Sequence, residues 1–247
     1  MLRERKHAFV DSMGEQTDRC PLFEASWNIP EDTHPLNQRQ YTLKKEGEAA
    51  ASLEFEKMEK NRVIFRQESD WKQPILLVRK PDGRWRIVID FCRLNKLIKP
   101  ISIPIPRIQD TLEALGGNSF FSTIDMNDGF HQLRLGETSK HQTAFIHKGI
   151  SYCYHRLPMG CLSSPGLFQL AMQLILRGLQ WKVCLIYLDD VNIHSATFEQ
   201  HIVDTNAVLE QMEAVEVTVY PKKCAWAMKM LKFLGHIVDI EGIKPIK

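Results

Sequence analysis

The stretch from Trp181 to Ser195, WKVCLIYLDDVNIHS, decides the fold of this chain. Two short apolar runs, Val183–Tyr187 and Val191–Ile193, flank the adjacent carboxylates Asp189 and Asp190. β-Branched and aromatic residues dominate both runs, so the pattern predicts two strands joined in a hairpin that carries both acids at its tip. Burying two unpaired carboxylates is costly, so such a tip is either fully solvated or neutralised by a cation.

The rest of the chain predicts an α+β fold in which hairpins dominate. The first 45 residues are polar, contain prolines and show no period, which is typical of an arm or linker. We expect helices at Glu46–Asn61, Arg107–Leu115, 163–176 and Thr197–Glu213, and strands at Ile75–Val78, Trp85–Ile89, Ser119–Ile124, Thr143–Ile146, Tyr152–Leu157 and Lys232–Ile240. In the last helix, Ile202, Leu209 and Met212 are expected to face the core.

Composition narrows the class of protein. With 247 residues, 44% of them hydrophobic, the chain can bury a core in one large or two small domains. Six scattered cysteines without a C-x-x-C pair favour a reducing compartment and argue against structural zinc. No apolar run approaches the ~20 residues of a membrane span, and the N-terminus lacks a signal-peptide core. We therefore expect a soluble intracellular protein without a membrane partner.

The net charge of +2 does not indicate nucleic acid, but the stretch from Lys72 to Lys99 holds eight basic residues against two acids. Within it, the turn Pro81-Asp82-Gly83 predicts a β-hairpin with Lys80 beside the turn and Arg86 in the second strand. For a lone hairpin, solvated charges are the ordinary explanation. The alternative is a cationic flap over a phosphate-rich ligand.

A third acid, Asp125, ends the predicted strand Ser119–Ile124, 64 residues before Asp189. If these strands are neighbours in one sheet, the carboxylates meet at one edge and suit Mg²⁺ or Mn²⁺. Two such ions about 3.5–4 Å apart support in-line phosphoryl transfer, one activating a hydroxyl and the other stabilising the leaving oxygen. The cationic hairpin would then bind a nucleotide triphosphate. A nuclease could share the carboxylates but has no clear need for that hairpin.

Seven motifs, in this order, resemble the reverse transcriptase of LTR retrotransposons and retroviruses. They are LLVRKPDGRWRIVIDFCRLNK, PIPRIQDTLEALGGNSFFSTIDMNDGFHQLRL, TAF, YCYHRLPMGCLSSPGLFQ, YLDDVNIHS, HIVDTNAVLEQM and KFLGHIVDIEG. The resemblance runs from about Gln38 to the C-terminus. It is closest to Gypsy-type retrotransposons, with a retrovirus-like feature in YCYHRLP.

The resemblance implies the fingers and palm of a right-hand polymerase, with an antiparallel palm sheet packed on helices. By the family pattern, residues 1–37 are an N-terminal arm, 38–100 and 131–160 are fingers, and 101–130 and 161–247 are palm. The chain stops at Lys247, where the thumb would begin, and it carries no RNase H, integrase or protease motif. We therefore expect the thumb to be absent and the chain to be a fragment of a pol polyprotein.

The resemblance also implies roles for single residues. Asp125 and Asp189 would hold two Mg²⁺ ions, and Asp190 completes the catalytic, metal-binding set. The residues expected to bind nucleotide are Lys80 and Arg86 at the phosphates, Asp128 and Gly129 in the turn beside the triphosphate, Phe130 against the sugar, and Met159. The residues expected to hold the primer end are Phe233, Leu234, Gly235 and His236.

Phe130 and Met159 are the two residues expected to lie near the sugar of the nucleotide. Phe130 alone would more often be a core aromatic, but by the family pattern its ring leaves no room for a 2′-hydroxyl and so selects deoxynucleotides. Met159 stands where retroviral enzymes carry Gln and Gypsy-type enzymes usually Phe. A methionine can pack near the sugar, but it cannot donate a hydrogen bond.

The resemblance thus implies an RNA-directed DNA polymerase that adds dNTPs to a primer 3′-hydroxyl on an RNA or DNA template, with two Mg²⁺ or Mn²⁺ ions. Its expected partners are template–primer, dNTPs and the remainder of a pol polyprotein with thumb, RNase H and integrase. The expected location is the cytoplasm, or a virus-like particle if the element is active. The alternative is a non-enzymatic or decayed retroelement remnant that keeps the fold. Intact acids and cations favour the first hypothesis, and the missing thumb favours the second.

Overall fold

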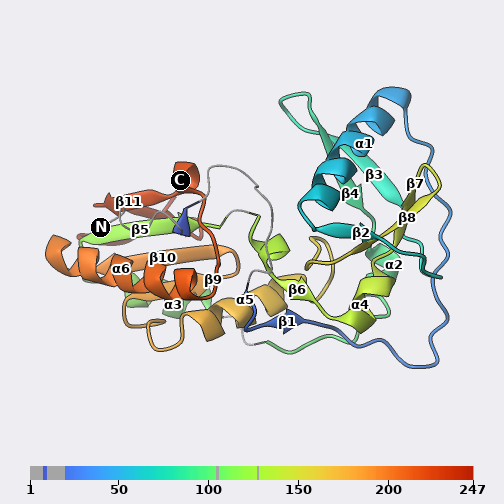
Figure 1. Ribbon diagram of the computed structural model, residues 1–247. Coiled ribbons are helices and arrows are strands. Elements are labelled where there is room, and N and C mark those ends of the chain that lie inside the picture. The colour runs from blue at the N-terminus through green and yellow to red at the C-terminus, as the bar shows by residue number, and fades with distance from the viewer. Residues whose placement is uncertain (1–7, 10–19, 104–105, 127, 247) are drawn as a thin grey trace. The chain divides into compact units, whose positions relative to one another are not determined.

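The computed structural model describes residues 8–9, 20–103, 106–126 and 128–246, and the chain divides into two compact units (Figure 1). Unit 1 comprises Met1–Met13, Ser102–Gly129 and Phe168–Lys247. Unit 2 comprises Gly14–Ile101 and Phe130–Leu167. None of the helices in the described residues has the length and apolar character needed to cross a membrane.

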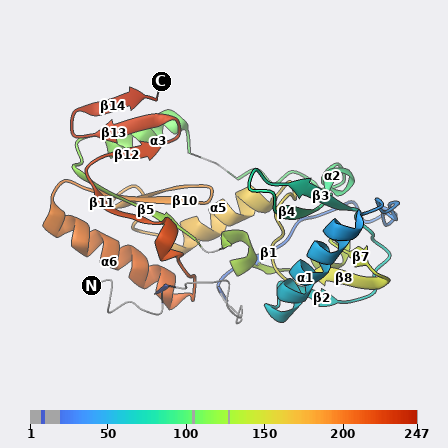
Figure 2. The same ribbon diagram turned by 90° about the horizontal axis from the view of Figure 1, so that it is seen from above.

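Unit 1 is built on an antiparallel four-stranded sheet of order β11-β5-β10-β9. Its strands are β5 (Phe120–Asp125), β9 (Cys184–Tyr187), β10 (Asp190–Ser195) and β11 (Ala225–Met228). Helix α6 (Phe198–Ala214) lies on one side of this sheet, and α3 (Ile108–Leu115) lies on the other together with a second sheet (Figure 2). The remaining elements are β12 (Leu231–Phe233), β13 (His236–Asp239) and β14 (Gly242–Pro245) of that second sheet, the 3-10 helix η3 (Pro221–Lys223), and α5 (Ser164–Ile175), whose first turn belongs to unit 2.

Side-chain alternation along β5 explains why both faces of the sheet are covered. Phe121 joins a buried apolar cluster with residues of α3, β9, β12 and β13, namely Leu112, Leu115, Leu185, Leu231, Phe233 and Val238. The next residue, Ser122, points to the opposite face, where it contacts His201 of α6. Alternate side chains of β5 therefore contact the layers on the two faces of the sheet.

Unit 2 contains the antiparallel sheet β2-β8-β7, the separate β3–β4 hairpin and a short parallel pair, β1–β6. Its strands are β1 (Glu24–Ala25), β2 (Ile64–Arg66), β3 (Ile75–Arg79), β4 (Trp85–Ile89), β6 (Arg134–Leu135), β7 (Phe145–His147) and β8 (Ile150–Tyr154). Its helices are α1 (Lys45–Lys60), α2 (Cys92–Asn95) and α4 (Glu137–Gln142), and the 3-10 helix η2 (Gly129–Gln132) begins at the unit boundary. Phe55 of α1 packs on Phe145 and Tyr152, with ring centroids 4.9 and 6.2 Å away.

The predicted α+β class is confirmed, but three local expectations differ from the structure. Lys232–Ile240 is not one strand, because the chain reverses at Leu234 and Gly235, whose φ angles of 48° and 77° suit a type I′ turn. Part of the expected arm, Glu24–Ala25, pairs with β6 instead. Ile202 is 39% exposed, since its neighbour His201 takes the inward position on α6.

Buried histidines make the stability of this fold depend on pH. Burial lowers the pKa of His131 to about 4 and also lowers the pKa of His147, His194 and His201. The unfolded chain protonates these rings near pH 6.5, so below that pH it binds more protons than the folded chain.

We predict that the thermal midpoint falls by roughly 5–10 °C as the pH is lowered from 6.5 toward 4. Melting curves followed by circular dichroism at several pH values would measure it. His131→Phe keeps an aromatic ring without the titration, so it should flatten the dependence. A midpoint that does not change across this range would contradict the prediction.

Candidate active site

The hairpin β9–β10 turns through only two residues, Leu188 and Asp189, because Tyr187 pairs directly with Asp190. Leu188 has φ 54°, the positive value that the first residue of a tight hairpin turn requires. The predicted hairpin is confirmed, with one correction: Asp189 lies in the turn, whereas Asp190 is the first residue of β10. The two carboxylates are therefore held by different parts of the hairpin.

A buried glutamine supports this turn. Gln169 of α5 is fully buried, its Nε2 donates to the carbonyl of Ile186 (3.2 Å), and its Oε1 accepts the N–H of Leu188 (2.6 Å). These bonds satisfy backbone groups beside a residue with positive φ. Sequence reasoning missed Gln169, although an amide within the apolar pattern of a helix is a signal that a buried partner exists.

Strand β5 places the third acid beside the hairpin. In the antiparallel register, Asp125 lies directly opposite Asp190, and Thr123 lies opposite Asn192. Thr123 Oγ1 donates to Asn192 Oδ1 at 2.9 Å on the same face as the acids. The strands are neighbours, as convergence of the acids requires, while the expected roles of the three carboxylates stay predictions.

Negative charge accumulates at this edge. Although Asp190 is exposed as a residue, partial burial of its carboxylate, and then the charges of Asp189 and Asp125, raise its pKa. Lys223 provides some compensation, with Nζ 3.5 Å from Asp125 Oδ1. Cys224 Sγ accepts the backbone N–H of Asp125 at 3.4 Å. The negative charges of the three carboxylates exceed the positive charge of Lys223, so this edge of the sheet favours the binding of a cation.

The donor set suits a hard divalent ion without forming a cage. In the part of the chain that the structure describes, no three or more His, Cys, Asp or Glu side chains gather closely enough to hold a metal by themselves. Mg²⁺ usually takes one or two carboxylates and fills its other positions with water and substrate phosphate. The facing pair Asp125 and Asp190, with Asp189 beside it, fits that pattern.

The β3–β4 hairpin of unit 2 carries two arginines with internal partners. The guanidinium of Arg79 lies 4.6 Å from the ring centre of Trp85 and 3.5 Å from Glu46. Arg84 forms an ion pair with Asp82 at 2.7 Å. A ligand would have to compete with these contacts.

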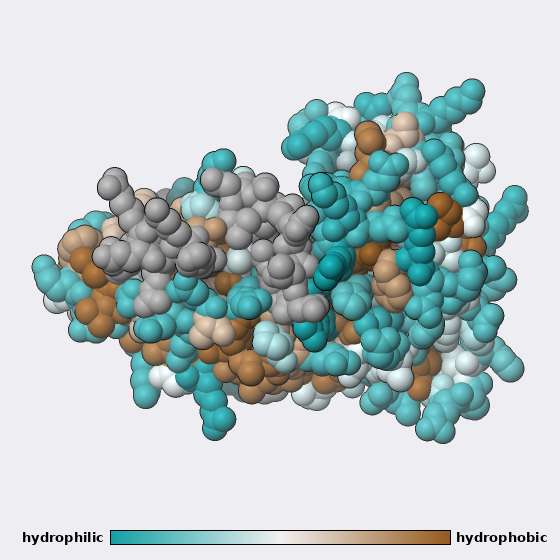
Figure 3. All heavy atoms as spheres, in the orientation of Figure 1, coloured by the Kyte–Doolittle hydropathy of each residue, from teal (hydrophilic) through white to brown (hydrophobic). Residues whose placement is uncertain are grey.

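Lys80 and Arg86 differ, because neither forms an ion pair with any described residue. Both are exposed, and the hairpin that carries them has a hydrophilic surface (Figure 3). They line a pocket of about 270 Å³ together with Met159 and His131. Three of the six predicted nucleotide-binding residues therefore share one pocket.

The other three predicted nucleotide-binding residues do not line that pocket. Asp128 and Gly129 belong to unit 1, where Asp128 has φ 46°. A Cβ on Gly129 would lie 2.9 Å from the ring of Phe168, so the close approach requires glycine. Phe130 begins the second segment of unit 2 and is partly buried.

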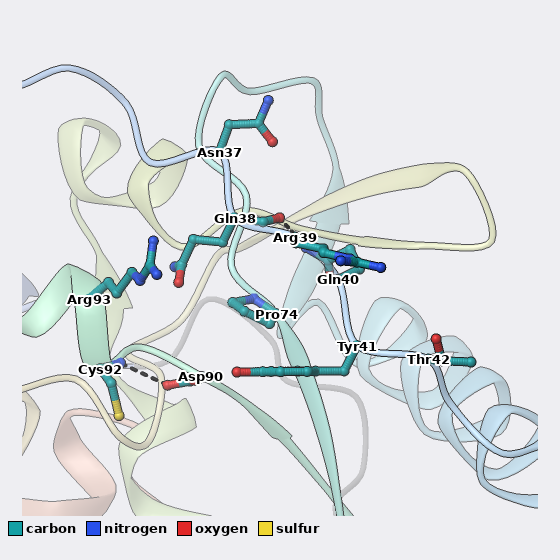
Figure 4. Close-up of a pocket in the computed structure, with 10 residues that line it drawn as sticks. All are labelled: Asn37, Gln38, Arg39, Gln40, Tyr41, Thr42, Pro74, Asp90, Cys92 and Arg93. Carbon is teal, nitrogen blue, oxygen red and sulfur yellow. Dashed lines mark hydrogen bonds between the residues drawn. The ribbon is translucent and has the colours of Figure 1, made fainter.

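Unit 2 also has a larger polar pocket that sequence reasoning did not identify. Its volume is about 670 Å³ (Figure 4), and it is lined by Asn37, Gln38, Arg39, Gln40, Tyr41, Thr42, Pro74, Asp90, Cys92 and Arg93. In Figure 4 the side chain of Tyr41 extends toward Asp90, whose Oδ1 accepts the N–H of Cys92 at 2.9 Å. Two arginines, several amides and one aromatic ring can bind phosphate and a planar base.

The expected primer-binding residues form the β12–β13 turn of unit 1. Phe233 is buried and meets Tyr187 edge-on, with ring centroids 6.3 Å apart. His236 Nδ1 lies 2.9 Å from the carbonyl of Leu234, within the same turn as Gly235. Since Tyr187 pairs with Asp190, this turn packs against the acidic hairpin.

Comparisons with known proteins identify the family to which this chain belongs. The family model described as reverse transcriptase (RNA-dependent DNA polymerase) matches residues 78–238, and the chain belongs to this family of enzymes. It is 36% identical over 216 residues to the retrovirus-related Pol polyprotein from transposon 297 of Drosophila melanogaster, covering 85% of this chain and 20% of the polyprotein. It is 30% identical over 219 residues to the corresponding polyprotein from transposon gypsy of the same organism, covering 86% and 21%.

Solved structures give the same result. The foamy viral protease-reverse transcriptase in complex with RNA/DNA hybrid superimposes with a TM-score of 0.86 and 26% identity, covering 99% of this chain and 32% of that one. The same protein with double-stranded DNA gives 0.84 and 26%, covering 99% and 50%. The chain thus has a retroviral reverse transcriptase fold, and it spans about a fifth of the length of the transposon polyproteins.

We predict that Lys223→Met strengthens Mn²⁺ binding by roughly two- to five-fold at low ionic strength. The variant removes a positive charge beside Asp125, and because both side chains are partly exposed the effect stays small. Electron paramagnetic resonance of free Mn²⁺ would measure the affinity. Lys244→Met is the matched control, since Lys244 pairs with Glu241 instead. Weaker Mn²⁺ binding in Lys223→Met would show that Lys223 orders the site rather than competing for it.

Proposed function

We propose that this chain is the fingers and palm of a reverse transcriptase that adds deoxynucleotides to a primer 3′-hydroxyl. The observation that carries the proposal is the β5–β10 register, which sets Asp125 opposite Asp190 beside Asp189. Opposed carboxylates destabilise a strand pair, so an arrangement that keeps them together is best explained by a cationic ligand. In this assignment unit 2 is fingers and unit 1 is palm.

In the proposed reaction, the primer 3′-oxygen forms a bond to the α-phosphorus of the incoming dNTP. The bond from that phosphorus to the bridging oxygen breaks, pyrophosphate leaves, and the hydroxyl proton is lost to solvent. Bound Mg²⁺ would make the hydroxyl more acidic and offset the charge on the transferring phosphate. Asp125 and Asp189 would hold the metal, and Asp190, which lies opposite Asp125, would complete the metal-binding set.

The remaining residues bind and select substrates. Lys80 and Arg86 grip the triphosphate, because neither would have to break an ion pair with a described residue. Met159 packs near the sugar, Phe130 excludes a 2′-hydroxyl, and the turn at Asp128 and Gly129 approaches the phosphates through its backbone.

Nucleic acid would contact both units. The turn Phe233–His236 holds the primer end. The pocket lined by Arg39, Tyr41 and Arg93 takes the template strand, by phosphate pairing and stacking. The chain would act with the thumb, RNase H and integrase of a pol polyprotein.

Primer extension tests the proposal. On poly(rA)/oligo(dT) with Mg²⁺, we predict that the chain incorporates dTTP and that Asp189→Asn lowers the rate roughly 100-fold or more. Synthesis at an unchanged rate in Asp189→Asn would exclude the proposed site. No incorporation by the unaltered chain, with the fold intact, would favour a non-enzymatic remnant.

A second prediction separates the hairpin cations. Lys80→Ala and Arg86→Ala should each raise the KM for dTTP roughly 10- to 100-fold, since each removes a charge-assisted contact to phosphate. Arg84→Ala is the matched control, because Arg84 is already paired with Asp82, and its KM should stay within about twofold. An equal rise of the KM in all three variants would mean that the hairpin binds dTTP only through its total positive charge.

A further inference from the structure

Helix α6 is fixed to the palm sheet by two kinds of contact. Val208, Leu209 and Met212 are fully buried and pack on the sheet. Apolar packing of this kind is not directional, so it tolerates small displacements of the strands beneath it. His201, on the same helix, is 2% exposed and makes directional hydrogen bonds.

His201 bridges the two strands that carry the acids. Its Nε2 lies 2.7 Å from Ser122 Oγ on β5, and its Nδ1 lies 3.1 Å from Ser195 Oγ on β10. Both serines are buried. One ring therefore contacts two adjacent strands: Asp125 is the last residue of β5, and Asp190 is the first residue of β10.

The donor and the acceptor of each hydrogen bond in this bridge can be assigned. Ser195 Oγ donates its only hydrogen to Asp204 Oδ2 at 2.6 Å, so it must accept from the Nδ1–H of His201. Burial lowers the pKa of His201, and the neutral ring then accepts from Ser122 through Nε2. Gln200 Nε2 holds the other oxygen of Asp204 at 2.8 Å. Each hydroxyl, ring nitrogen and carboxylate oxygen of Ser122, His201, Ser195 and Asp204 therefore has a hydrogen-bond partner.

The same network reaches the neighbour of β5. Strand β11 is irregular between Ala225 and Met228, and Ala227, with φ 48°, donates its N–H to Ser122 Oγ at 2.9 Å. This irregular strand follows Lys223 and Cys224, the residues that contact Asp125. Ser122 therefore binds both His201 and β11, the strand that follows the two residues in contact with Asp125.

The bridge that His201 forms between Ser122 and Ser195 favours one register of β5 and β10 over its neighbours. Opposed like charges disfavour a register in which Asp125 faces Asp190, so the acids themselves do not specify it. A slip of β10 by one residue would turn Ser195 to the other face of the sheet. A slip by two residues would move it roughly 7 Å along the strand, out of reach of a ring bound to Ser122.

We propose that His201 is a positioning residue, which locks the β5–β10 register and thereby holds Asp125 opposite Asp190 for metal binding. It contacts neither substrate nor metal and acts through Ser122 and Ser195. The metal-binding part of this inference rests on the proposed function, whereas the register lock does not.

The test measures Mn²⁺ affinity by electron paramagnetic resonance and amide hydrogen exchange in β5 and β10, on the full chain. His201→Phe should weaken Mn²⁺ binding at least 10-fold and speed exchange in both strands at least 10-fold. His201→Gln, which restores an acceptor near Ser122, should recover binding to within about threefold of the unaltered chain.

Val208→Ala is the matched control, because it removes buried packing from the same helix without touching the bridge. It should lower the thermal midpoint and leave Mn²⁺ affinity within twofold. Equal loss of affinity in Val208→Ala and His201→Phe would overturn the proposal, as would an unchanged affinity and exchange rate in His201→Phe.

Two further measurements keep the outcome decisive. If His201→Phe does not fold, Ser195→Ala removes one arm of the bridge, and unchanged exchange in β10 of that variant overturns the lock. If Asp189→Asn binds Mn²⁺ as well as the unaltered chain, the metal site of the proposed function fails. In that case the amide exchange rates of β5 and β10 in His201→Phe still test whether His201 locks the strand register.

Discussion

Two carboxylates, Asp125 and Asp190, face each other across neighbouring strands, and the local interaction between them is repulsive. The surrounding unit compensates for that repulsion. Sheet pairing, the Thr123–Asn192 side-chain bond and the turn at Leu188 and Asp189 hold the strand ends in place. The raised pKa of Asp190 reflects the same crowding of burial and negative charge. A fold that preserves such an arrangement keeps negative charge concentrated at one edge of a sheet.

Support for this edge comes from buried polar side chains on two helices. Gln169 of α5 satisfies the backbone at the acidic turn, and His201 of α6 bridges the serines of β5 and β10. Apolar packing supplies most of the stability of such a unit and disfavours a slip by one residue, whereas directional bonds also disfavour a slip by two residues, which keeps each side chain on its own face. Both residues lie on helices, whereas the three acids lie on strands or in the turn between them.

In the other unit, pairing decides which charges are available. Four cations lie on the β3–β4 hairpin, and without the family resemblance their positions in the sequence do not separate them. Arg79 and Arg84 have acidic partners, and Arg79 also lies over the ring of Trp85, while Lys80 and Arg86 line a pocket with Met159. The family to which the chain belongs is described as an RNA-dependent DNA polymerase. Under the proposed function, the two cations of this hairpin would bind the triphosphate of the incoming nucleotide.

The sequence by itself determined the two hairpins, the long helices and the position of Asp125 at a strand end, because alternation, turn residues and caps are local signals. Thr197, for example, caps α6 as its position predicts, accepting the N–H of Gln200. Tertiary structure decided what depends on contacts between distant residues: Lys223 beside Asp125 and the pocket around Tyr41. It also turned His201 rather than Ile202 toward the sheet. A periodicity of apolar residues cannot anticipate that choice, since a buried histidine is stable only where partners such as Ser122 and Ser195 are brought to it by other strands.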